Sequence, residues 1–277
     1  MSVLLNESVI NSIKYFYIFF IGASLGSFYK TLLDRIFYYF YSPIRKSLTL
    51  KEKYYNLFFQ PSFCFHCKNK IKRIYVIPLF GYFLTKKRCS YCKKKLEFHY
   101  WLWEISGGVL LVYFVSIYNI FGVFFVLVVF HYLITAIVDY RKFFIDFENL
   151  FFVYLWNFLL VFFFKEDLKA IIIRVFLFIG IFLILFFIGK KKKLGFGDIL
   201  LVGGLAIYFS IWEMILIINF SAIGSVIYIL FYKKNIRSPA PLGFFLSISG
   251  IVLVLLEPLF LDFYKITQLF VEPMLVI

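Results

Sequence analysis

The chain has 277 residues, of which 63% are hydrophobic and 16% are charged, and 30 lysines and arginines against 15 acidic residues give it a net charge of +15. Soluble domains are roughly 45–50% apolar, so this composition excludes an ordinary soluble protein and indicates an integral membrane protein. An excess of lysine and arginine in a membrane protein indicates which loops face the cytoplasm and where the protein contacts anionic lipid. We therefore expect the lipid bilayer as a partner and no nucleic acid.

Eight apolar segments predict membrane-spanning helices, because one span takes about 20 residues. They lie near residues 9–28, 101–118, 121–138, 150–164, 170–189, 199–210, 212–232 and 243–261. The segments at 150–164 and 199–210 are shorter than a simple span, so we expect them to tilt or to open into a cavity. The predicted fold is all-α and polytopic, with about eight transmembrane helices.

The composition changes abruptly between residues 42 and 100, where 14 lysines and arginines stand against Glu52 and Glu97. This stretch is the one plausible water-exposed domain. We therefore predict three parts: a first transmembrane helix with its exit at 1–41, a small cytoplasmic basic domain at 42–100, and a membrane core at 101–277.

The basic domain contains all four cysteines of the chain, arranged as two CxxC pairs. They are Cys64, Cys67, Cys89 and Cys92. Each pair places two thiolates on one tight turn, and two such turns complete a tetrahedral Zn²⁺ shell. Redox dithiols and free thiols are the alternatives. We predict a structural zinc site that supplies much of the folding free energy of this domain.

The basic loops predict the orientation of the spans, because lysine and arginine are enriched on the cytoplasmic side. Placing 30–100 in the cytoplasm also places residues 140–142, Lys190 to Lys193 and residues 233–237 there. Two spans separate Asp139 from the cysteines, and two more separate Asp198 from Asp139. We therefore expect both aspartates and the cysteine domain on the cytoplasmic face.

Two aspartates adjoin apolar helices at the predicted membrane edge. Asp198 follows Gly195 and Gly197 in the segment LGFGDIL, and Asp139 ends the apolar run 121–138. Acids in such places are costly, so each is a candidate functional residue. Asp198 can also be a helix-capping acid and Asp139 a solvated loop charge. Asp146 and Glu148 are competing acids nearby.

Two carboxylates that face each other can hydrolyse a peptide bond. Like charges at close range cannot both ionise easily, so the pair holds one proton. The ionised acid takes a proton from the attacking water, and the protonated acid assists the carbonyl oxygen or the leaving nitrogen. Gly195 and Gly197 permit close approach of a substrate. The pair Asp139 and Asp198 thus predicts an aspartic peptidase.

Further motifs accompany these acids through most of the chain. They are GSFYKTLLDR at 26–35, PSFCFHC at 61–67, IPL at 77–79, LTKKRCSYC at 84–92, Tyr100, Glu104 and APLGFF at 240–245. Together the motifs resemble the bacterial prepilin peptidase family, the type IV prepilin leader peptidases that also N-methylate the mature pilin. The family's catalytic aspartates fall on Asp139 and on Asp198 of the GxGD motif. Lys30 replaces the usual Asn.

The resemblance implies a peptidase of the bacterial inner membrane that acts at the cytoplasmic face. Its substrate would be a prepilin or pseudopilin with a short basic leader, cut after a Gly, and S-adenosylmethionine would donate the methyl group for N-methylation. Asp34, Glu97 and Glu104 are candidate contacts for the leader, and Glu104 either lines the catalytic cavity or snorkels to water. The alternatives are a GxGD protease of other membrane proteins and a non-catalytic, metal-binding assembly or transport subunit.

Overall fold

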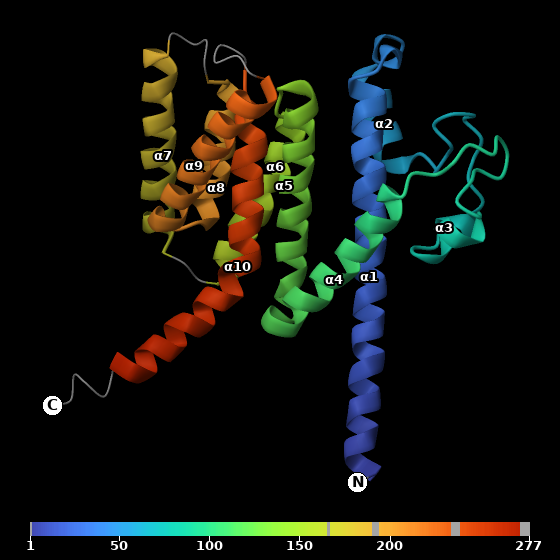
Figure 1. Cartoon of the computed structure of the whole chain (residues 1–277), viewed down its shortest axis with the longest axis horizontal. Coiled ribbons are helices and arrows are strands. Elements are labelled where there is room, and N and C mark those ends of the chain that lie inside the picture. The colour runs from blue at the N-terminus through green and yellow to red at the C-terminus, as the bar shows by residue number, and fades with distance from the viewer. Residues whose placement is uncertain (1, 165–166, 190–193, 234–238, 272–277) are drawn as a thin grey trace. The chain divides into compact units, whose positions relative to one another are not determined.

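The computed structural model describes residues 2–164, 167–189, 194–233 and 239–271. Lys190 to Lys193 and most of 233–237, on which the predicted orientation partly depends, lie outside the described residues. The chain divides into two compact units, residues 1–126 and 127–277. All regular elements of the described ranges are helical (Figure 1), which confirms the predicted all-α fold.

The first unit is built on two long helices, α1 (Ser2–Phe40) and α4 (His99–Tyr118). The helices α2 (Leu50–Phe59) and α3 (Phe80–Leu84) lie in the connection between them, with the short turns η1 (Pro43–Lys46) and η2 (Arg73–Val76). Glycines allow α1 and α4 to touch: a Cβ at Gly22 would lie 2.3 Å from the carbonyl oxygen of Gly107, and one at Gly26 would lie 2.0 Å from that of Trp103. Small residues thus bring the two backbones together.

The second unit contains the end of α5 (Gly122–Lys142), which follows the short turn η3 (Asn119–Phe121). It continues with α6 (Phe147–Phe163), α7 (Leu168–Ile188), α8 (Phe196–Tyr208), α9 (Ile211–Ile227), the π-helical turn η4 (Tyr228–Lys233) and α10 (Leu242–Val271). Helix α8 lies among α6, α7, α9 and α10 and packs against them (Figure 1). Its residues from Leu201 to Ile207 are buried. The short apolar run at 199–210 is therefore a helix enclosed by protein.

The lengths of the helices agree with a membrane protein. Four helical segments are long and apolar enough to cross a bilayer: Val9–Phe40, His99–Lys142 (which joins α4 and α5), Leu168–Ile188 and Ile211–Tyr232. Three shorter apolar helices are Phe147–Phe163, Phe196–Tyr208 and Leu242–Pro258. Each of the eight predicted apolar segments lies on a helix of the structure.

Candidate functional site

Asp198 lies in the first turn of α8, where the free backbone N–H groups of a helix favour a negative charge. Its Oδ2 accepts the N–H of Gly195 at 3.0 Å. The side chain therefore does cap the helix, as one of the two interpretations of the sequence suggested. This capping bond also fixes the direction in which the carboxylate points.

Asp139 is buried at the end of α5, with 5% of its surface exposed. It is therefore not a solvated loop charge. Its Oδ2 accepts the N–H of Phe244 at 2.9 Å, from the first turn of α10. A second helix N-terminus thus compensates part of the cost of burying this acid.

The start of α10 brings the two aspartates together. The backbone N–H of Gly243 interacts with the carboxylates of both Asp139 and Asp198. A Cβ added to Gly243 would lie 3.0 Å from Asp139 Oδ2, so only glycine leaves room for this arrangement. The side chain of Ile145 fills the space beside it, within 3.1 Å of a Cβ added to Gly197. One backbone N–H therefore faces both predicted acids.

A buried polar network continues from Asp139 along α5. Thr135 and His131 precede it by one and two turns and lie on the same face of the helix. Asn149 of α6 donates to Thr135 Oγ1 at 2.6 Å and to the carbonyl oxygen of His131 at 3.0 Å. Its Oδ1 lies 2.7 Å from His131 Nδ1. These bonds fix α5 to α6 directly behind Asp139.

The competing acids lie at the start of α6. Asp146 precedes the helix and its carbonyl oxygen accepts the N–H of Leu150, while Glu148 is exposed in the first turn. Ile145, next to Asp146, is the residue that this segment places against Gly243.

In the first unit, the four cysteine sulfurs lie within 4.8 Å of one another. Cys64 Sγ is 3.9 Å from Cys92 Sγ, and Cys67 Sγ is 3.9 Å from Cys89 Sγ. A tetrahedral zinc ion about 2.3 Å from each sulfur sets sulfur separations of about 3.8 Å, so these residues fit the metal. The cluster supports a metal site compatible with zinc.

Two similar turns carry the cysteines. The N–H of Lys68 donates to the carbonyl of Cys64, and the N–H of Lys93 donates to that of Cys89. Both lysines have positive φ, 63° and 59°. Burial raises the pKa of the Cys89 thiol, but N–H groups of Cys92 and Tyr91 outweigh it and lower the pKa to about 7. The two turns thus bring the four sulfurs together in similar backbone conformations.

Glu104 is buried and holds three segments of the first unit together. Its Oε1 accepts the hydroxyl of Ser27 at 2.9 Å, and its Oε2 accepts the N–H of Leu79 at 2.7 Å. Leu79 has a positive φ of 68°, so this bond stabilises a strained turn before α3. Both oxygens of Glu104 are therefore engaged by the protein itself.

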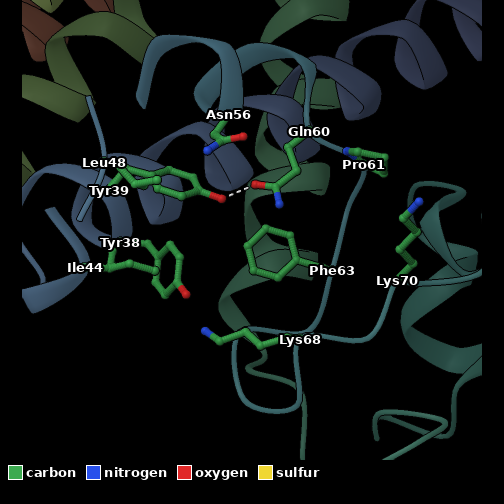
Figure 2. Close-up of a pocket in the computed structure, with 10 residues that line it drawn as sticks. All are labelled: Tyr38, Tyr39, Ile44, Leu48, Asn56, Gln60, Pro61, Phe63, Lys68 and Lys70. Atoms are coloured by element: carbon green, nitrogen blue, oxygen red, sulfur yellow. Dashed lines mark hydrogen bonds between the residues drawn. The ribbon is translucent and has the colours of Figure 1, made fainter. Parts of the chain in front are cut away.

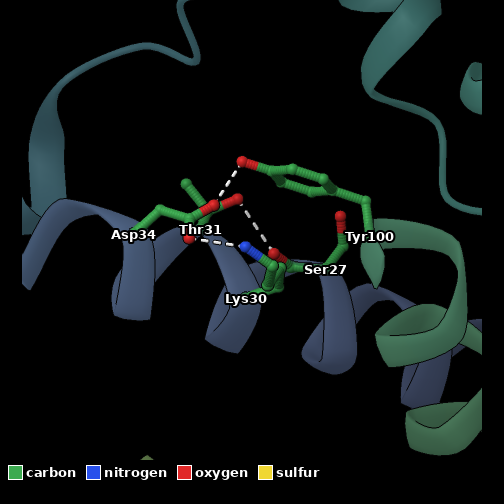
Figure 3. Close-up of polar contacts among 5 residues, drawn as sticks. All are labelled: Ser27, Lys30, Thr31, Asp34 and Tyr100. Carbon is green, nitrogen blue, oxygen red and sulfur yellow. Dashed lines mark hydrogen bonds and ion pairs between the residues drawn. The ribbon is translucent and has the colours of Figure 1, made fainter. Parts of the chain in front are cut away.

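Asp34 is likewise engaged within the first unit (Figure 3). Its Oδ1 pairs with Lys30 at 2.5 Å, and Tyr100 donates its hydroxyl to Oδ2. The ammonium of Lys30 also lies 4.3 Å from the centre of the Tyr100 ring. Of the three acids predicted to meet a basic leader, Glu97 is the exposed one.

A cavity of about 290 Å³ separates the end of α1 from the first cysteine turn (Figure 2). Tyr39, Gln60 and Phe63 line it, and Tyr39 donates to Gln60. Lys68 lies 4.1 Å from the centre of the Tyr38 ring and donates to the carbonyl of Phe65 at 2.8 Å. These contacts hold the cysteine turn against α1.

Residues 20–118 match the family model of the bacterial peptidase A24 N-terminal domain. The match covers 99 of the 277 residues and is to the N-terminal domain of this peptidase family. The match supports the prepilin peptidase family and peptidase activity at the family level, as the motifs predicted. No curated protein and no solved structure matches the chain. The matched domain ends before Asp139 and Asp198, so their roles rest on the geometry above.

Sequence reasoning found Gly243 and Phe244 within the motif APLGFF at 240–245 but gave them no role at the two aspartates. Phe244 acts through its backbone N–H, and the motif alone does not say which acid this group meets. Thr135 gives a weak signal in the sequence, because a polar residue inside an apolar run is costly unless it is hydrogen-bonded. Asn149 gives a similar signal at the start of the next apolar segment.

Proposed function

We propose that the chain is a membrane aspartic endopeptidase of the prepilin-leader type, with Asp139 and Asp198 as its catalytic pair. The observation that supports this most strongly is the Gly243 N–H, which faces both carboxylates. The Asp139 carboxylate also interacts electrostatically with that of Asp198, and two neighbouring carboxylates can divide the work of acid and base.

The pair supports hydrolysis by a water held between the two side chains. The ionised carboxylate takes a proton from this water, whose oxygen attacks the scissile carbonyl carbon. The protonated carboxylate gives its proton to the developing oxyanion. When the tetrahedral intermediate collapses, the C–N bond breaks and the leaving nitrogen takes a proton from one carboxylic acid of the pair. A hydroxyl of the intermediate returns a proton to the other carboxylate as the product carboxyl group forms, so the pair ends with one proton as it began.

The surrounding residues orient the pair in this scheme. The N–H groups of Phe244 and Gly195 each hold one carboxylate in place. Gly195 is exposed and leaves space for a peptide backbone beside Asp198, whereas the side chain of Ile145 occupies the space beside Gly197. We assign these residues to positioning and to substrate access.

The proposed substrate is a prepilin or pseudopilin with a short basic leader, cut after its Gly at the cytoplasmic face of a bacterial inner membrane. We also propose N-methylation of the new amino terminus, with S-adenosylmethionine as the donor. The cysteine cluster would hold a structural zinc ion through Cys64, Cys67, Cys89 and Cys92. The ion would add a rigid crosslink to the first unit.

Co-expression with a candidate prepilin in a host that lacks its own peptidase tests this proposal. We expect a shortened pilin whose first residue is the one that follows the leader Gly. The mass of this residue should be greater than that of the unmodified residue by one methyl group. An unshortened prepilin, with the membrane-inserted chain present, would contradict the peptidase. A shortened but unmethylated product would contradict the methyl transfer alone.

A further inference from the structure

The segment from η2 to α3, residues 73–84, presents an apolar surface that its own unit does not cover. Its exposed side chains are between 41% and 55% accessible: Ile74, Val76, Ile77, Phe80, Phe83 and Leu84. On the opposite side of the segment, Gly81 and Tyr82 are buried. Six large apolar side chains within twelve residues form a patch that marks contact with a partner or a membrane.

This patch is continuous with the membrane-facing surface of α1. The ring of Phe80 stacks on that of Phe20 with the centroids 5.9 Å apart. Phe20 lies inside the candidate span Val9–Phe40, and its neighbours Phe16 and Ile21 are themselves exposed. Phe20 is eight residues before Phe28, the predicted end of the hydrocarbon-spanning part, which is about 12 Å along a helix. The segment therefore lies at a depth that α1 places within the bilayer.

Aromatic contacts with α4 agree with this depth. Phe83 packs edge-on against Trp101 with the centroids 5.9 Å apart, and Phe98 packs on the same tryptophan at 5.3 Å. Tryptophan and tyrosine are enriched where a bilayer meets water. The patch thus lies beside an aromatic cluster of the kind that borders the hydrocarbon.

The backbone of the segment is prepared for a medium without water, in which each unpaired N–H is costly. Pro78 has no N–H to satisfy. The N–H groups of Leu79, Phe80 and Gly81 donate to the Glu104 carboxylate and to the carbonyls of Pro78 and Ile77. The buried Glu104 therefore satisfies the N–H of Leu79.

Exposed basic residues lie at the first position of the segment and just outside its two ends: Arg73, and Lys72, Lys86, Lys87 and Arg88. The ammonium of Lys87 lies 5.8 Å from the centre of the Tyr82 ring and 5.9 Å from that of Phe83. A lysine above aromatic rings can bury its stem in lipid while its charge reaches the headgroups. These five residues, the basic flank, complement an anionic lipid surface.

We propose that residues 73–84 form an interfacial membrane anchor whose apolar side chains enter the bilayer beside α1 and whose basic flank contacts anionic headgroups. The partner is lipid, because the patch continues the lipid-facing surface of a span and its charge is opposite to that of anionic lipid. Only residues 85–88 separate the anchor from Cys89, so it holds the cysteine cluster close to the membrane surface. This inference concerns the attachment of the first unit and does not depend on the proposed catalytic pair.

Site-specific photo-crosslinking tests the anchor in the full chain. We would place p-benzoylphenylalanine at Phe83, and at Phe59 of α2 as the matched control, since Phe59 is a more exposed aromatic residue of the same connection. Helix α2 packs near Arg35, more than a helical turn beyond Phe28. Each variant would be reconstituted in vesicles of phosphatidylglycerol and phosphatidylethanolamine, with bound zinc measured as the check on folding.

We expect lipid adducts at position 83 in several-fold excess over position 59, as read by mass spectrometry of the labelled peptide. Equal lipid adducts at the two positions, or a crosslink from position 83 to a second protein chain, would overturn the anchor. In vesicles of phosphatidylcholine alone, we expect fewer adducts at position 83. Equal yields in the two lipid mixtures would overturn the role of the basic flank.

Discussion

The substitution Gly243→Ala should impair cleavage more than it impairs folding. The added Cβ would lie 2.7 Å from Ile145 Cδ1, 3.0 Å from Asp139 Oδ2 and 3.1 Å from Asp139 Cγ. Overpacking of this kind costs about 1–3 kcal/mol of stability. The carboxylate must also move by a few tenths of an ångström. Because a misplacement of about 1 Å in a catalytic site can cost about 100-fold, we expect leader removal to fall about tenfold or more.

A second substitution separates packing from catalysis. Ile145→Val removes the Cδ1 atom that is nearest to the added Cβ, while the two contacts with Asp139 remain. The double variant should therefore regain stability in detergent, measured by thermal unfolding, and still process a co-expressed prepilin slowly. Gly180→Ala is the matched control, because a Cβ there meets nothing within 4 Å. Leader removal by Gly243→Ala at the wild-type rate, or a full recovery of that rate in the double variant, would refute the reasoning.

Three further predictions concern the metal and the polar network. Metal analysis of the purified chain should find about one zinc per chain, and Cys64→Ser should remove it; zinc retained by that variant would contradict a four-thiolate site. Lys93→Gly should stabilise zinc binding by about 1 kcal/mol, because Lys93 has a positive φ that glycine adopts without strain. Lys94→Gly is the control and should not stabilise it. Competition with a chelator measures the zinc affinity of both variants, and equal effects would contradict the backbone argument. Asn149→Ala should lower the free energy of unfolding by about 2–3 kcal/mol, because it leaves the buried hydrogen-bond partners of Asn149 unpaired. Asn219→Ala, on an exposed face, is the control and should change the free energy of unfolding little. Equal losses of stability in chemical denaturation would count against the network.

The helices were predictable because apolar runs of span length leave the backbone few alternatives in lipid. All eight predicted segments are helical, including 199–210, whose short length has a physical explanation. Helix α8 is enclosed by other helices, so it need not match the bilayer thickness. The cysteine cluster was equally predictable, since the ligand spacing alone specifies the turns.

The surroundings of the candidate site were not predictable, because they depend on contacts between distant segments. The bonds from Phe244 to Asp139 and from Leu79 to Glu104 involve backbone N–H groups; both residues lie in motifs of the sequence, but the motifs do not identify the distant acid that each N–H meets. The position of Glu104 illustrates the limit. Its sequence context left a catalytic cavity and a water-facing location equally open, whereas the structure shows a buried acid that satisfies a strained turn.

The most direct test of the catalytic pair is leader removal by Asp139→Asn and Asp198→Asn, each co-expressed with a prepilin that the wild-type chain processes. Asp146→Asn is the control, since Asp146 is a nearby acid outside the proposed pair. We expect both variants of the pair to remain in the membrane and to leave the prepilin uncut, while Asp146→Asn processes it. Processing by either variant of the pair, or an equal loss in Asp146→Asn, would contradict the assignment.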